Sequence, residues 1–287
     1  MSLLVVLLLA VIQGAFMFVP VSSTSHLALT QHLLGEEGVV IPPPDAAEMI
    51  LFDLVLHVGT VVSIVVVLRR RLMDGLLRLA SDVRLWRSGV RGLRRLPALR
   101  VAALLAVSTV VTGVAGFGVR SVAPGVFASP ALIAVALVLT GAILWWTDYA
   151  PTGRFGTTDI GLAVAVVVGA SQALALLPGL SRSGLTIAVA LALGVYRRSA
   201  AEYSFVLAIP TILSATLVQG ALVMRSAEPV TLSFSAFAVG FVVAAGVGVV
   251  ALLAVLRLLL TARFRYFTPY VWALAVVVLV VDPGKPF

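Results

Sequence analysis

The sequence predicts an all-α integral membrane protein in which six transmembrane helices and two re-entrant helical hairpins form an inverted-topology repeat. The chain has 287 residues, of which 61% are hydrophobic and only 11% are charged, a composition too apolar for a soluble globular domain. Several runs of about 20 residues carry no charge, which is the length of a membrane-crossing helix. Two further apolar runs, 3–34 and 160–195, are interrupted by Pro20 and Pro178.

Six runs are long and apolar enough for full spans: 49–68, 101–119, 130–147, 203–224, 235–256 and 267–281. The two interrupted runs divide into pieces of about 15 residues, or roughly 22 Å of helix, which is short of the ~30 Å of hydrocarbon in a bilayer. Proline ends or kinks the helix that precedes it. We therefore expect 3–34 and 160–195 to be hairpins that return to the side from which they enter.

The basic residues predict the orientation of these elements. Ten of the nineteen arginines fall in 69–100, which the positive-inside rule assigns to a cytoplasmic loop that touches membrane lipids. With both hairpins re-entrant, sixteen basic residues lie inside and three outside, with Arg182 left in the membrane. This clustering between apolar runs argues against nucleic-acid binding despite the net charge of +8.

Three spans separate the hairpins, so the hairpins enter the membrane from opposite faces. The chain accordingly divides into a first repeat, 1–150, and a second repeat, 151–287. Inverted repeats with broken helices commonly place a binding site near the membrane midplane, where the repeats meet. The polar residues of the two hairpins are therefore the candidate site.

The first hairpin carries consecutive hydroxyl side chains inside an apolar run. Ser22, Ser23 and Thr24 follow Pro20 and suit a helix N-terminus, where free N–H groups favour an anion. Plain N-capping and small-residue packing are the alternative interpretation. His26 is the candidate for proton transfer or nucleophilic attack, because imidazole titrates near neutral pH. His57, four residues after Asp53, is interpreted mainly as a structural residue.

The second hairpin carries Arg182 between Ser181 and Ser183. An arginine at membrane depth needs a counter-ion. Asp53 or Glu202 could supply it, or the partner is a ligand phosphate, which the guanidinium fork fits well. Both the ion pair and the phosphate site stay open at this point.

These motifs resemble those of the undecaprenyl-diphosphate phosphatase family, also called the bacitracin-resistance proteins. One match runs from Gln13-Gly14 through Pro20 to His26-Leu27, and the other covers Pro178–Gly184 and Thr186. Stretches at 52–60 and 201–210 support it. The resemblance implies six spans with two opposed hairpins, often as a homodimer. It also implies a multi-pass protein of the bacterial cytoplasmic membrane that hydrolyses undecaprenyl (polyprenyl) diphosphate at a site open to the outer face.

By position, the resemblance makes Ser23 and His26 the catalytic pair and Arg182 the phosphate clamp. The residues expected to bind substrate around them are Gln13, Ser22, Thr24, Ser181, Ser183, Thr186 and Asp53. A divalent cation, Mg²⁺ or Ca²⁺, is the expected cofactor if there is one, with its ligands left open.

One position departs from the family pattern. Met17 stands where the first motif usually has a glutamate that acts by acid–base chemistry or through a metal. A thioether does neither, since Mg²⁺ takes oxygen ligands. Asp53 is the first candidate to substitute for that carboxylate and Glu48 the second. The alternative is a non-hydrolytic transporter or binder of polyprenyl phosphate.

Overall fold

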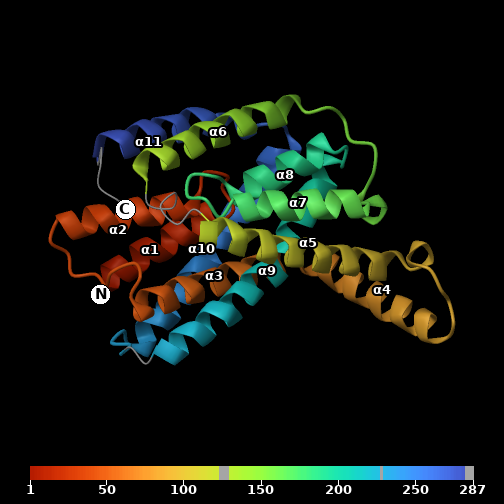
Figure 1. The fold of residues 1–287 in the computed structure, drawn as a ribbon, viewed down its shortest axis with the longest axis horizontal. Helices are drawn as coiled ribbons and strands as arrows, with labels where there is room; N and C mark the ends of the chain where they lie inside the picture. Colours follow the sequence, from red (N-terminus) through yellow and green to blue (C-terminus); the bar gives the residue numbers. More distant parts are fainter. Residues whose placement is uncertain (123–128, 227–228, 282–287) are drawn as a thin grey trace.

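The computed structural model describes residues 1–122, 129–226 and 229–281, which form a helical bundle (Figure 1). Within these residues, five helices are long and apolar enough to cross a membrane: α3 (Ala47–Val67), α5 (Pro97–Val122), α6 (Pro130–Tyr149), α9 (Arg197–Ser226) and α10 (Phe234–Leu260). The sixth predicted run forms α11 (Thr268–Val281), which has 14 residues. The only β pairing among the described residues is a bridge between Phe155 and Val195. The predicted all-α membrane protein is confirmed at this level.

Each interrupted run forms two short helices joined inside the bundle. These are α1 (Leu3–Phe16) with α2 (Ser23–Glu36), and α7 (Leu162–Leu174) with α8 (Arg182–Ala192). The helices end a few residues before the prolines, so Pro20 and Pro178 lie in the connections. Each connection contains a residue in the left-handed region: Ser22 with φ 67° and Gly179 with φ 97°. These residues turn the chain back into the second helix of the hairpin.

The first helix of each hairpin packs tightly against a long helix, α1 against α10 and α7 against α5. A glycine makes each approach close. A Cβ atom at Gly14 would lie 2.7 Å from the carbonyl oxygen of Ala244, and one at Gly169 would lie 2.6 Å from that of Ser108. Because backbone meets backbone at both crossings, the two connecting loops are held in fixed positions within the bundle.

The segment 69–100 is mostly helical, and its place on the cytoplasmic side of the membrane stays a prediction. It contains α4 (Arg69–Arg87) and the short helix η1 (Leu93–Arg95). Leu72, Leu76 and Leu79 recur every three to four residues, which is the apolar stripe of an amphipathic helix. The six arginines of α4 hide this stripe in the sequence. In Figure 1, α4 lies beside the N-terminal part of α5, and the two project beyond the other helices.

The carboxylate of Asp82 fastens α4 to the start of α5. One of its oxygens accepts hydrogen bonds from the backbone N–H groups of Ala98 at 2.7 Å and Leu99 at 3.0 Å. These are among the N–H groups that a helix leaves without an internal partner. The Asp82 carboxylate therefore holds the two helices together next to the segment that connects them, at the end of α4 away from α3.

Candidate functional site

A cavity of about 310 Å³ lies where the two hairpin loops meet α3, α5 and α9. Its polar lining comes from both halves of the chain: Ser22, Ser23, Thr24, His57, Thr112, Gln172, Ser181, Arg182, Thr211, Thr216 and Gln219. Apolar residues, among them Leu54, Ala208 and Ile212, complete the wall. The cavity therefore joins a polar end, built by the hairpins, to an apolar wall.

Five of the predicted site residues line this cavity: Ser22, Ser23, Thr24, Ser181 and Arg182. The other five, Gln13, His26, Asp53, Ser183 and Thr186, do not line it. They lie behind the lining or support it. Thr186, for example, donates a hydrogen bond to the carbonyl of Arg182 at 2.8 Å.

Hydrogen bonds between the hairpin loops hold the polar end together. The backbone N–H of Gly179 donates to the Ser22 hydroxyl at 3.1 Å, and the Ser183 hydroxyl donates to the carbonyl of Phe18 at 3.2 Å. Gly179 is required at its position, because a Cβ there would lie 2.5 Å from the carbonyl oxygen of Ile133 and its φ is 97°. The loops thus form one rigid unit, although about 160 residues separate them in the chain.

Arg182 is the first residue of α8 and points to the first hairpin. Its Nη2 lies 3.5 Å from the sulfur of Met17, a weak acceptor. Its Nη1 is buried and has no hydrogen-bond partner in the described part of the chain. Glu202, one of the two predicted counter-ions, is engaged by Arg71 at 3.5 Å and Arg198 at 3.1 Å.

Asp53 forms no ion pair with Arg182 either. Its Oδ1 is buried without a hydrogen-bond partner among the described residues, and the residue does not line the cavity. Within the described ranges, the Arg182 guanidinium therefore lacks a carboxylate partner. A buried charge of this kind is costly unless an anion meets it.

Met17 lies between two donors. The side-chain amide of Gln13 approaches its sulfur at 3.7 Å, and Nη2 of Arg182 approaches it at 3.5 Å. The Gln13 Oε1 is buried and has no partner in residues 1–122, 129–226 and 229–281. A carboxylate at position 17 would accept from both donors, whereas the thioether satisfies them weakly.

His26 has both ring nitrogens engaged. Its Nδ1 donates to the carbonyl of Ser22 at 2.7 Å, so in the neutral ring Nε2 accepts from the Tyr270 hydroxyl at 2.7 Å. The ring also packs on Phe16, with centroids 4.1 Å apart. These contacts fasten α2 to its own N-terminus and to α11.

His57, in contrast, lines the cavity. Its Nδ1 donates to the carbonyl of Asp53 at 2.8 Å, and its Nε2 has no hydrogen-bond partner in the part of the chain that the structure describes. The pairing of His57 with Asp53 thus uses the backbone carbonyl and not the carboxylate. A sequence signal did exist: Asp53, His57 and Thr60 recur at the spacing of one face of an otherwise apolar helix.

The cavity does not fit Mg²⁺ or Ca²⁺ well. Both ions take carboxylate oxygens, and no aspartate or glutamate lines the cavity. Glu48, the second predicted substitute for the missing carboxylate, accepts hydrogen bonds from the backbone and hydroxyl of Thr231 at 2.9 and 2.7 Å. The described residues also contain no group of three or more histidine, cysteine, aspartate or glutamate side chains that could hold a metal.

Comparison with known proteins identifies the relatives of this chain. Residues 6–277 match the family model described as "Bacitracin resistance protein BacA". A protein of Alkalilimnicola ehrlichii named undecaprenyl-diphosphatase is 51% identical, over 96% of this chain and 95% of the relative. Proteins of the same name from Halorhodospira halophila and Desulfatibacillum aliphaticivorans are 46% and 36% identical, over 97% and 98% of this chain and 97% and 99% of theirs.

Proposed function

Because this chain belongs to the bacitracin resistance protein family, we propose that it hydrolyses undecaprenyl diphosphate to undecaprenyl phosphate and inorganic phosphate. The family that the two hairpin motifs indicate is confirmed by the match over residues 6–277. Relatives that match nearly the whole chain are named after this activity. The chain is a multi-pass membrane protein, and its reaction would return the lipid carrier used for cell-wall polymers.

One observation carries the proposal: Arg182, whose Nη1 is buried and which has no carboxylate partner among the described residues, lines a cavity together with the hydroxyl-rich loops of both hairpins. The guanidinium fork of Arg182 suits the terminal phosphate of a diphosphate lipid. The hydroxyls of Ser23, Thr24 and Ser181 supply further donors. The apolar wall, with Leu54, Ala208 and Ile212, would take the first units of the prenyl chain.

Hydrolysis then needs an attacking water and a group that accepts its proton. The water oxygen bonds to the terminal phosphorus, the bond from that phosphorus to the bridging oxygen breaks, and the monophosphate leaves with the electron pair. Arg182 and the hairpin hydroxyls stabilise the charge on the transferred phosphoryl group. The proposed place of Ser23 is at the reacting group, which its position in the cavity lining supports.

His57 is the better-placed group for the proton. Its Nε2 is free of protein partners among the described residues, whereas the Nε2 of His26 accepts from Tyr270. The role proposed for His26 is therefore to position α2 and the hydroxyls at its start. No step is assigned to a divalent cation, because the lining supplies no carboxylate.

The finer topology belongs to the same proposal. Six spans and two opposed re-entrant hairpins in an inverted repeat are supported by the matching contacts of α1 with α10 and of α7 with α5. The arginine-rich end of the bundle would face the cytoplasm, and the cavity would open to the outer face. The homodimer that the family resemblance implies stays a prediction. The names of the relatives do not favour a non-hydrolytic transporter.

Release of phosphate from a prenyl diphosphate by the purified protein tests the proposal. Arg182→Ala should lower the rate by at least about 100-fold, the scale of a lost electrostatic contact in a transition state. Arg198→Ala removes an arginine outside the cavity and serves as the matched control. Equal rates for the two variants would reject the proposed role of Arg182, and no release by the wild type would reject the phosphatase.

A further inference from the structure

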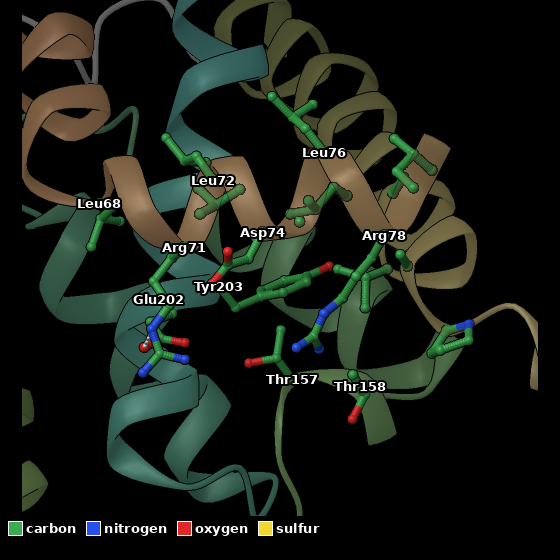
Figure 2. A pocket seen from close by; sticks show the side chains of 18 of the residues that line it. Leu68, Arg71, Leu72, Asp74, Leu76, Arg78, Thr157, Thr158, Glu202 and Tyr203 are labelled. Atoms are coloured by element: carbon green, nitrogen blue, oxygen red, sulfur yellow. Dashed lines mark ion pairs between the residues drawn. The ribbon is translucent and has the colours of Figure 1, made fainter. Parts of the chain in front are cut away.

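A second cavity, of about 520 Å³, lies between α4, the start of α5, the start of α9 and the short helix η3 (Thr157–Asp159) (Figure 2). It shares no lining residue with the cavity between the hairpins. It lies at the arginine-rich end of the bundle, where α4 joins α3. Nothing in the proposed hydrolysis uses it.

One side of this cavity is apolar. Leucines repeat along the face of α4 that lines it, and aliphatic residues of α5 and α9 face them: Leu68, Leu72, Leu76, Leu79, Val101, Leu105 and Val206. Leu76 is 60% exposed. An apolar wall of this extent gains stability when hydrocarbon covers it.

The other side is polar and basic. Arg71 and Arg198 share one oxygen of Glu202, at 3.5 and 3.1 Å. Arg78 has no ion pair or hydrogen bond within the described residues, and Figure 2 shows its side chain extending toward Thr157. With Asp74 and Glu202 as the acidic residues of the lining, the three arginines leave a positive excess.

We propose that this cavity binds an anionic phospholipid. The lipid phosphate would meet Arg78 with the hydroxyls of Thr157 and Thr158, and one acyl chain would lie along the leucines of α4. The ten arginines of 69–100 against two aspartates attract an anionic membrane surface to this end of the molecule. A free phosphate ion would leave the apolar wall uncovered, and a zwitterionic headgroup would not balance the charge of the Arg78 guanidinium.

The test uses the full-length protein in nanodiscs of phosphatidylcholine alone, or of phosphatidylcholine mixed with phosphatidylglycerol. Native mass spectrometry after release from the disc counts the lipids that stay bound. The wild type should retain phosphatidylglycerol in preference to phosphatidylcholine. Arg78→Gln should lower this retention about fivefold to tenfold, as expected for one lost contact of a guanidinium with a lipid phosphate.

Arg84→Gln is the matched control, because it removes the same charge from α4 at a residue outside the cavity lining. It should leave retention unchanged. Leu105→Trp, which fills the apolar side, should also reduce retention, and its melting temperature shows whether it folds. Added inorganic phosphate should not displace the bound lipid.

Several results would overturn the proposal. Equal losses in Arg78→Gln and Arg84→Gln would mean general charge attraction, and full displacement by inorganic phosphate would mean a site for the free ion. Retention without preference between the two lipids, or unchanged retention in Arg78→Gln, would also contradict it. The measurement does not depend on hydrolysis, so a failed phosphatase assay would leave it intact.

Discussion

The two cavities use arginine in opposite ways. Between the hairpins, Arg182 has a buried Nη1, lacks a carboxylate partner among the described residues, and shares the cavity lining with several hydroxyls. At the other end, exposed arginines are numerous, and two of them share the carboxylate of Glu202. The difference teaches that burial without a counter-ion, and not the number of charges, marks the residue that has to bind an anion.

The largest effect should come from removing the buried charge. We expect Arg182→Ala to lower phosphate release by about 100-fold to 1,000-fold, because a donor to the transferred phosphoryl group is lost. Arg71→Ala, at the exposed cluster, should stay within about threefold of the wild type, since exposed ion pairs contribute little. Phosphate release is measured on both purified variants. A greater loss in Arg71→Ala than in Arg182→Ala would contradict the assignment of the anion site to Arg182.

His57 of α3 and His26 of α2 should differ as well. We expect His57→Gln to lower phosphate release by about 100-fold, the usual contribution of a general base. It should also remove the fall in rate at low pH, because a protonated imidazole cannot accept the proton. His26→Gln and Tyr270→Phe should cost less, lower the melting temperature, and keep the fall at low pH. A retained pH profile in His57→Gln would return the proton step to His26.

Position 17 offers a gain-of-function comparison. A glutamate there would accept from Gln13 and Arg182, where the sulfur now lies 3.7 and 3.5 Å from their nitrogens. It would give the cavity its first carboxylate and hence an oxygen ligand for Mg²⁺. We expect Met17→Glu to make phosphate release rise about tenfold with added Mg²⁺. The wild type and Met17→Gln should change by less than about threefold. An equally strong response of the wild type would show that other ligands hold the ion.

The smallest effects concern the two close helix crossings. Gly14→Ala and Gly169→Ala should each destabilise the protein by about 1–3 kcal/mol, because a Cβ would lie 2.7 and 2.6 Å from a backbone oxygen. Gly113→Ala has nothing within 4 Å of its new Cβ and should be neutral or stabilising. Thermal unfolding in detergent measures all three. A neutral Gly169→Ala beside a costly Gly14→Ala would argue against equivalent hairpins.

Much of the helix pattern was predictable because charge-free runs and their proline breaks are local features. The predicted run 130–147 and α6 (Pro130–Tyr149) nearly coincide. The helix α4 was missed because its arginines concealed the spacing of Leu72, Leu76 and Leu79. In that segment, local charge density and helical periodicity point to different structures.

The site was predictable only as a set of candidates. Arg182 and Ser23 stand out in sequence because polar groups are rare at membrane depth. His26 differs from His57 because its Nε2 is engaged by the hydroxyl of Tyr270, 244 residues away in the chain. His57 lies on the face of α3 that lines the cavity. Contacts of this kind arise from packing between distant helices and leave no local pattern.

The most direct test is the binding of a non-hydrolysable prenyl diphosphonate to the wild type and to Arg182→Gln, measured by calorimetry in one detergent. If the phosphate group of the lipid is the counter-ion of Arg182, the variant should bind at least about tenfold more weakly, as expected for the loss of a charge-assisted hydrogen bond. Equal affinity of the two proteins would contradict the account.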